Sequence, residues 1–432
     1  FDDLIGETVY LFRAFPDVAA VYQKKFRHIL VDEYQDTNHA QYSLIRELTR
    51  PVEIEHANVD QRTGAVLEPA SLTVVGDSDQ SIYAFRGADI RNISEFEKDF
   101  AGATTILLEQ NYRSTQNILS AANAVIGNNF DRPNKNLWTD SGDGDKIVGY
   151  TGYSAHDEAQ FIADEINQQH RDGANYADVA VFYRTNAQTR ALEEIFIRAG
   201  IPYRVVGGTK FYERQEIKDA FGYLVAIANA RDDLATRRIL NVPKRGIGDT
   251  TVDRLDAYAT KENIAFALAL RRTADAGIGA AAAKGIASFV ALIDDLESRM
   301  GQGPGPVLRH ALEASGYLSE LQAEGTVESD GRYENLAELI GSASEFTQVD
   351  EFLEQVALVA DTDQLDSDNH VTLMTLHSAK GLEFEAVFIV GMEEGIFPHS
   401  RALVDQNELE EERRLAYVGI TRAKQKLFLT HA

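Results

Sequence analysis

The chain has 432 residues, of which 44% are hydrophobic, enough for several packed cores and roughly two to four domains of ordinary size. No apolar run approaches the ~18 residues of a membrane span, the first residues do not resemble a signal peptide, and cysteine is absent. These features exclude a membrane protein and a disulfide scaffold and indicate a cytoplasmic location. The net charge of −26 excludes a surface that binds nucleic acid everywhere, so any nucleic acid must bind at local sites.

Short β-rich apolar segments alternate along the chain with longer amphipathic segments. Strands are predicted at 28–33, 72–77, 104–109, 178–185, 371–376, 386–391 and 426–430. This alternation is typical of an α/β fold with a parallel sheet. Ligands of such sheets bind at the carboxyl ends of the strands, and five polar residues lie at or just past the ends of predicted strands, namely Asp32, Asp77, Gln110, Arg184 and His377.

The pattern changes between about 221 and 368, where one helical segment follows another around an Ala-rich run and a GQGPGP break. We interpret this stretch as a helical insertion inside the second sheet domain. The polar stretch 51–71 is predicted to be a surface excursion between two strands.

The segment VDEYQDTN places Asp32 and Glu33 at the end of a predicted strand. An Asp in this position can hold Mg²⁺ on nucleotide phosphates while the Glu polarises the attacking water. The next segment, VVGDSDQSIYAFRGAD, supplies Gln80, Tyr83 and Phe85. A carboxamide can sense a γ-phosphate and exposed aromatic rings can stack on unpaired bases, although ordinary core packing is an alternative for the two rings.

Six segments together resemble superfamily 1 DNA helicases of the UvrD/PcrA type, and they occur in the order seen in that family. They are VDEYQDTN, GDSDQSIYAFRGAD, LLEQNYRST, FYRTNAQTRALEE, TLHSAKGLEFEAVFIVGMEEGIFPH and EEERRLAYVGITRAK. The resemblance covers nearly the whole chain. It implies RecA-like domains and the use of ATP and Mg²⁺.

The resemblance also implies the roles of the residues at the nucleotide. Asp32 would bind Mg²⁺, Glu33 would be the general base and Gln80 would couple the γ-phosphate to DNA. Tyr112 would stack on adenine and Glu383 would accept the ribose hydroxyl. Two arginines, Arg113 and Arg422, would reach the γ-phosphate from the second domain, where they stabilise transition-state charge when the domains close.

By the same resemblance, the single-strand path would be lined by Tyr83, Phe85, Arg86, Asn186, Arg190 and His377. Many relatives have Arg-Trp where this chain has Ala84-Phe85, so we expect a smaller stacking platform. The turn PKRGIGDTT would bring Lys244, Arg245, Gly246 and Gly248 to duplex DNA. From the residues alone, a plain connection between two helices is the alternative for this turn.

No G-x-x-x-x-G-K-[S/T] phosphate loop occurs in the chain. In the family this loop precedes VDEYQDTN, so we expect a fragment, which also opens on Phe1, without ATPase activity of its own. The expected domains are the C-terminal part of the first RecA-like domain (1–107), a second RecA-like domain in two parts (108–220 and 369–432) and the helical insertion (221–368).

The leading hypothesis is an ATP-dependent 3′→5′ DNA helicase that acts in repair or replication. Its partners would be single-stranded DNA and junctions between duplex and single strand, with repair or replication proteins as further partners. One alternative is a non-catalytic module that binds DNA or protein. Another is a subunit of a helicase-nuclease.

Overall fold

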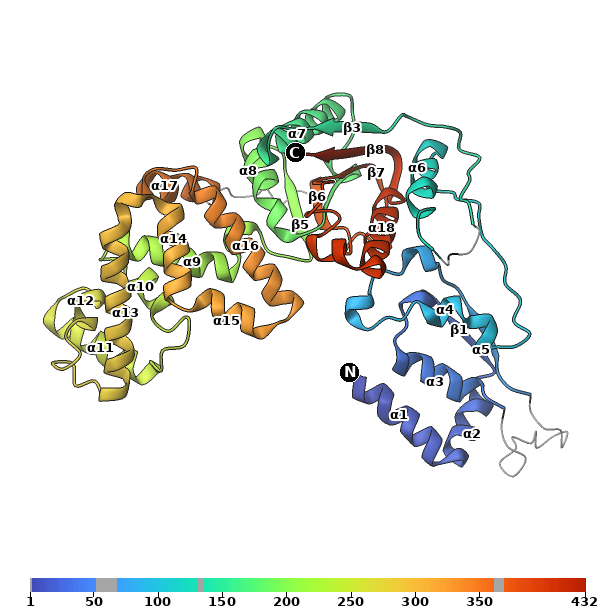
Figure 1. The fold of residues 1–432 in the computed structure, drawn as a ribbon, viewed down its shortest axis with the longest axis horizontal. Helices are drawn as coiled ribbons and strands as arrows, with labels where there is room; N and C mark the ends of the chain where they lie inside the picture. The colour runs from blue at the N-terminus through green and yellow to red at the C-terminus, as the bar shows by residue number, and fades with distance from the viewer. Residues whose placement is uncertain (1, 52–67, 131, 133–134, 361–368) are drawn as a thin grey trace. The chain divides into compact units, whose positions relative to one another are not determined.

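The computed structural model describes residues 2–51, 68–130, 132, 135–360 and 369–432 (Figure 1). Most of the predicted surface excursion at 51–71 therefore lies outside the described residues. Two compact units are present, one formed by Phe1–Tyr150 with Leu376–Leu429 and the other by Thr151–Thr375 with Thr430–Ala432. The domain boundaries at 107, 220 and 368 stay a prediction. Among the residues that the structure describes, no helix has the length and apolar composition needed to cross a bilayer.

The strands form two sheets, which confirms the α/β class. The smaller sheet pairs β1 (His28–Val31) with β2 (Ser71–Val74) in parallel, with His28 opposite Ser71. The larger sheet has the strand order β3-β8-β7-β4-β6-β5, and β7 with β8, β4 with β6 and β5 with β6 are parallel pairs. Its strands are β3 (Val148–Thr151), β4 (Val179–Tyr183), β5 (Tyr203–Val206), β6 (Val371–Thr375), β7 (Phe384–Ile389) and β8 (Ala423–His431).

One predicted strand is wrong. Residues 104–109 form no strand, and the side chains of Ile106 and Leu108 are 77% and 75% exposed. An apolar run becomes a strand only where another strand offers its backbone groups, and within the described ranges only a single bridge, between Gln110 and Trp138, lies beside this run. The prediction also missed β3 and β5.

In the first unit, helix α18 packs on α6 and on strand β7. Buried side chains of α6, such as Ile118 and Ala122, form this core, and Phe388 of β7 stacks on Phe428 of β8 with ring centroids 4.2 Å apart. The helices of this unit are α1 (Asp2–Ala14), α2 (Pro16–Lys25), α3 (His39–Thr49), α4 (Arg91–Ser94), α5 (Phe96–Asp99), α6 (Gln116–Ile126) and α18 (Gln406–Ile420).

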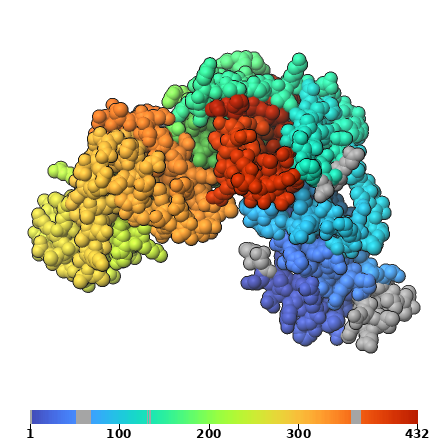
Figure 2. Space-filling view, in the orientation of Figure 1, coloured from blue at the N-terminus to red at the C-terminus, as the bar shows by residue number. Residues whose placement is uncertain are grey.

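In the second unit, helices α7 and α8 pack against each other, and the described residues from 221 to 360 contain helices without any strand. The yellow and orange surface in Figure 2 shows much of this helical part as one closely packed body. The helices of the unit are α7 (Ala155–Arg171), α8 (Thr189–Ala199), α9 (Gln215–Ala228), α10 (Asp233–Leu240), α11 (Asp249–Glu262), α12 (Phe266–Leu270), α13 (Ala280–Arg299), α14 (Pro304–Ala314), α15 (Tyr317–Glu324), α16 (Val327–Ala343) and α17 (Val349–Ala360).

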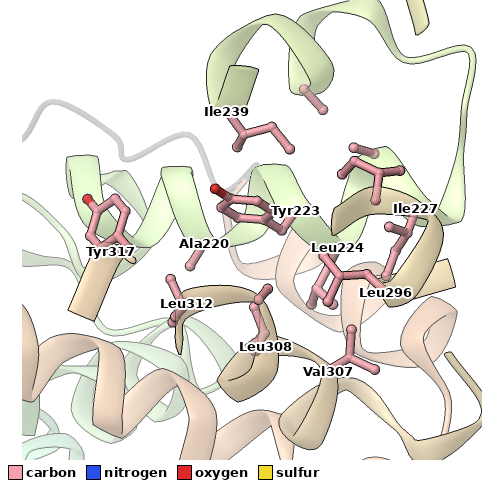
Figure 3. Close-up of a cluster of buried hydrophobic side chains, with 14 of the residues drawn as sticks. Ala220, Tyr223, Leu224, Ile227, Ile239, Leu296, Val307, Leu308, Leu312 and Tyr317 are labelled. Atoms are coloured by element: carbon pink, nitrogen blue, oxygen red, sulfur yellow. The ribbon is translucent and has the colours of Figure 1, made fainter. Parts of the chain in front are cut away.

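The core of this helical part forms around α9, which packs against α10, α13, α14 and α16. Ala220 of α9 points toward Leu312 of α14, and Leu224 and Leu308 belong to the same buried cluster (Figure 3). This core gives the helical part its own source of hydrophobic stability.

Candidate functional site

Two adjacent carboxylates follow strand β1. Asp32 and Glu33 are both exposed, and one carboxylate oxygen of Asp32 accepts a hydrogen bond of 2.9 Å from the Glu33 amide. The backbone of Glu33 has a φ of 50° and a ψ of 43°, the left-handed conformation that side chains other than glycine rarely adopt. The chain therefore turns sharply at this residue and enters the short 3₁₀ turn η1 (Tyr34–Asp36).

Gln35 holds the Glu33 side chain in place, although the sequence analysis did not single it out. This fully buried amide donates from Nε2 to Glu33 Oε2 at 2.6 Å and accepts at Oε1 from the Asp77 amide at 2.9 Å. Gly76 leaves room for it, because a Cβ at that position would lie 2.5 Å from Gln35 Oε1. Gln35 thus connects the ends of β1 and β2.

Lys380 is a second residue whose role the sequence analysis missed. Its Nζ lies 3.2 Å from Glu33 Oε2 and 2.5 Å from Asp36 Oδ2, and it donates to the Gln80 carbonyl oxygen at 2.9 Å. Burial raises the pKa of the Asp36 carboxyl, and the hydrogen bond from Lys380 offsets only part of this effect. The proposed general base therefore lies beside a cation in this structure.

Gln80 lies near the Asp32–Glu33 pair, because the parallel strands β1 and β2 end at the same sheet edge. Its Nε2 donates to Asp77 Oδ2 at 2.8 Å.

Two further cations, which no sequence pattern singled out, neutralise the neighbouring carboxylates. Lys135 Nζ lies 2.5 Å from Asp77 Oδ1, and Arg132 makes two hydrogen bonds to Asp79.

Arg422 is a buried cation that, within the described part of the chain, has no carboxylate at ion-pair distance. The residue is 4% exposed, and its guanidinium donates to the Val418 and Leu382 carbonyl oxygens and to Thr421 Oγ1 at 3.1, 3.4 and 3.1 Å. Burial lowers the pKa of Arg422 to about 10, and the nearby positive charge of Arg113 adds to the lowering. A buried charge without a counterion favours binding of an anion.

Arg113 and Glu383, predicted to bind phosphate and ribose, lie together but pair with each other. Arg113 Nε donates to Glu383 Oε2 at 2.6 Å, and Lys424 Nζ lies 3.2 Å from Glu383 Oε1. The hydrogen bonds from Arg113 and Lys424 hold the pKa of Glu383 below its ordinary value. Tyr112 is 83% exposed, so its ring is accessible for stacking.

Four of the residues predicted to bind a single strand form one cluster, although His377 lies far along the chain from the others. Ring centroids are 6.0 Å apart for Tyr83 and Phe85 and 5.3 Å apart for Phe85 and His377. The Arg86 guanidinium lies 5.2 Å from the Tyr83 ring and 5.4 Å from the Phe85 ring. Phe85 remains 49% exposed, so this cluster can offer a ring to a base.

The second unit carries the other two predicted single-strand residues, and the structure places them differently. Asn186 is exposed at the start of the 3₁₀ turn η6 (Asn186–Gln188). Arg190 is 5% exposed and pairs with Glu194 and Glu338. Arg190 thus lies inside the protein instead of on its surface, and a direct contact of this residue with DNA stays a prediction without support from its position.

The glycine turn lies just before helix α11. Lys244 is exposed, whereas the Arg245 guanidinium points inward, where it donates to the carbonyl oxygens of residues 239, 240, 242 and 243. Gly246 has a φ of 71°, and Gly248 is the N-cap of α11. Lys244 and the two glycines can therefore meet a phosphate, while Arg245 stabilises the turn.

The described residues contain no group of three or more carboxylate, histidine or cysteine side chains that could hold a metal ion. Asp32 and Glu33 are the exposed carboxylates that directly follow β1. A single carboxylate fits Mg²⁺, which is commonly bound by one or two carboxylates together with substrate phosphates and water.

Family models match both parts of the chain. The UvrD-like helicase C-terminal domain matches residues 106–432, and the UvrD/REP helicase N-terminal domain matches residues 1–101. The chain therefore belongs to the UvrD-like helicase family. It is similar to the ATP-dependent DNA helicase UvrD1 of Mycobacterium leprae, with 51% identity over 463 residues, and to the ATP-dependent DNA helicase PcrA of Bacillus subtilis, with 47% identity over 447 residues. The alignments cover 100% of this chain and 59% and 58% of these two relatives.

Proposed function

We propose that this protein is an ATP-dependent DNA helicase that translocates 3′→5′ along single-stranded DNA in repair or replication. The observation that carries the proposal is Arg422, a buried guanidinium without a carboxylate partner in the described residues, next to Arg113. The direction and the cellular process come from the family resemblance, and the printed names of the relatives support the use of ATP and DNA.

The residues proposed to contact the nucleotide would each have a separate role. Asp32 would hold Mg²⁺, which neutralises developing phosphate charge when it is bound. Glu33 would orient and deprotonate the attacking water, and Gln35 would fix the Glu33 carboxylate through its 2.6 Å hydrogen bond. Arg113 and Arg422 would stabilise charge on the γ-phosphate. Arg113 contacts Glu383 through Nε, so the other N–H groups of its guanidinium would bind the phosphate, and the Glu383 carboxylate would accept the ribose hydroxyl.

The aromatic cluster of Tyr83, Phe85, Arg86 and His377 would bind the single strand in the same unit as these nucleotide ligands. The Tyr83 hydroxyl donates to the His377 carbonyl oxygen at 3.1 Å, and Lys380 Nζ lies 5.5 Å from the Tyr83 ring. One lysine therefore contacts both the proposed base and the proposed DNA cluster. We propose that this contact is part of the coupling between DNA binding and ATP hydrolysis.

The test is DNA-stimulated phosphate release by the full-length protein and by a Glu33→Gln variant. The variant should bind ATP and a dT oligomer normally and lose nearly all turnover, because glutamine cannot accept the proton. Glu95→Gln is the matched control, since Glu95 forms an exposed pair with Lys98. A wild-type protein without DNA-stimulated turnover, or an active Glu33→Gln variant, would contradict the proposal.

A further inference from the structure

The backbone of Asn186 is held by a buried arginine from another part of the second unit. Arg214 donates from Nη1 to the Asn186 carbonyl oxygen at 2.9 Å and from Nη2 to Thr189 Oγ1 at 3.0 Å. Thr189 Oγ1 in turn donates to the same Asn186 carbonyl oxygen at 3.1 Å. The Asn186 side chain is exposed, so its direction is set by a backbone that two donors fix from inside the protein.

Helix α16 supplies acceptors for both buried arginines around this turn. Asn335 Oδ1 accepts from Arg214 Nη1 at 3.0 Å, and Glu338 Oε1 accepts from Arg190 Nε at 2.8 Å. The two acceptors are three residues apart and therefore lie on one face of the helix. Both arginines are nearly fully buried, at 5% and 6% exposed, which strengthens these hydrogen bonds and makes their loss costly.

Further contacts extend the network, and Arg214 Nε also donates to the Thr209 carbonyl oxygen at 3.2 Å. Arg190 Nη1 also donates to both carboxylate oxygens of Glu194, and Asn335 Nδ2 donates to Glu216 Oε1 at 2.7 Å. Through these contacts, α16 of the helical part is connected to residues 186–190, the turn η6 and the start of α8. A displacement of α16 must therefore either move this turn or break charge-assisted hydrogen bonds.

We propose that Arg214 and Arg190 are positioning residues through which helix α16 sets the orientation of Asn186 toward a single strand. The inference rests on the proposed function, because it takes Asn186 as a ligand of single-stranded DNA. It gives Arg190 a role that its burial permits, in place of a direct contact with DNA. It also makes the single-strand affinity at Asn186 depend on the position of the helical part.

The test uses Asn335→Ala and Glu338→Gln in the whole chain, with Glu328→Gln as control. Glu328 lies on the same helix but forms an exposed pair with Arg332. Both test variants should exchange the backbone amides of residues 186–190 faster and bind a fluorescent dT oligomer about 3- to 10-fold more weakly, as expected for loss of one hydrogen bond at the ligand. The control should match the wild type, and circular dichroism should show that all variants are folded.

A double-mutant cycle separates positioning from general structural damage. In an Asn186→Ala background, Asn335→Ala and Glu338→Gln should weaken DNA binding no further, because their effect passes through Asn186. Equal losses in both backgrounds, or unchanged amide exchange, would overturn the inference while leaving the proposed function standing. A wild-type chain that binds no single strand would refute the DNA role of Asn186 as well.

Discussion

The guanidinium groups of Arg113 and Arg422 have different kinds of partner in this structure. Arg113 has a carboxylate partner in Glu383, whereas Arg422 has carbonyl and hydroxyl oxygens only among the described residues. A phosphate would therefore compete with a carboxylate for Arg113, but only with carbonyl and hydroxyl oxygens for Arg422. This difference suggests that Arg422 contributes to nucleotide affinity and Arg113 to the catalytic step.

Replacement of Arg113 by alanine in the full-length protein should lower kcat by about 10³-fold, as for other arginines that stabilise the transition state of phosphoryl transfer. Tyr112→Ala should mainly raise the KM for ATP, because its exposed ring would lose stacking on adenine. Steady-state phosphate release measures both parameters. Arg91→Ala, which removes an exposed arginine paired with Asp89, should have no effect. Near-normal turnover of the Arg113 variant would reject its assignment.

Glu194 should make the second unit sensitive to acid. Burial alone would raise the pKa of its carboxyl, but hydrogen bonds from His156 and Tyr212 and the charge of Arg190 lower it from 4.5 to about 2. A pKa that is lower in the folded state stabilises the fold above pH 4.5, and this contribution is lost as the pH falls toward 2. The difference corresponds to about 3 kcal/mol.

Glu194→Gln should therefore lower the free energy of unfolding by about 3 kcal/mol at pH 7, and the difference from the wild type should shrink below pH 4.5. Urea denaturation at several pH values measures the effect. Glu328→Gln, at an exposed position, serves as control. A difference that does not change with pH would mean that packing, and not the charge of Glu194, stabilises this network.

At the scale of the elements, the start of helix α11 offers its first amide groups beside the exposed Lys244. A Cβ at Gly248 meets no atom within 4 Å, so a larger side chain fits there and would cover these amides. Gly248→Leu should weaken binding to a duplex–single-strand junction more than binding to a single strand, as measured by fluorescence anisotropy at fixed salt.

Gly279→Leu is the matched control for this experiment. Gly279 is likewise the N-cap of a helix, α13, with nothing within 4 Å of an added Cβ. Its replacement should leave both affinities unchanged. Equal losses for junction and single strand in the Gly248 variant would count against a duplex contact at this turn.

The elements also show what the sequence could and could not predict. Parallel strands and their polar ends were predictable, because apolar runs and turn residues are local signals. The run at 104–109 has the same local signal but no neighbouring strand in the described residues, so it forms no strand and its side chains are exposed. The contacts of Lys380 with Glu33 and of Arg214 with Asn335 join residues far apart in the chain, and no local pattern encodes them.

At the scale of the whole molecule, the 432 residues include the proposed ligands of the γ-phosphate and the adenine but no glycine-rich phosphate loop with its lysine. We predict that this chain alone hydrolyses no ATP, even with saturating single-stranded DNA, because the triphosphate is not held against Glu33. A phosphate-release assay beside the full-length protein measures this. Comparable turnover of the two proteins would reveal another phosphate site in the chain.

At Glu33, the left-handed backbone brings the stability of the fold and the proposed catalytic role into conflict. A side chain in this conformation costs about 1 to 2 kcal/mol, which glycine avoids, although glycine also gains about 0.5 to 1 kcal/mol of freedom in the unfolded chain. Glu33→Gly also removes the acceptor of Gln35 Nε2 and the partner of Lys380, so the relieved strain and the lost contacts oppose each other. The variant should therefore unfold at nearly the same urea concentration as the wild type, while the full-length variant loses turnover. A clear loss of stability would show that the contacts of the side chain outweigh the backbone strain. If Glu33 is the base, the strained turn is a local cost in stability that the position of its carboxylate requires.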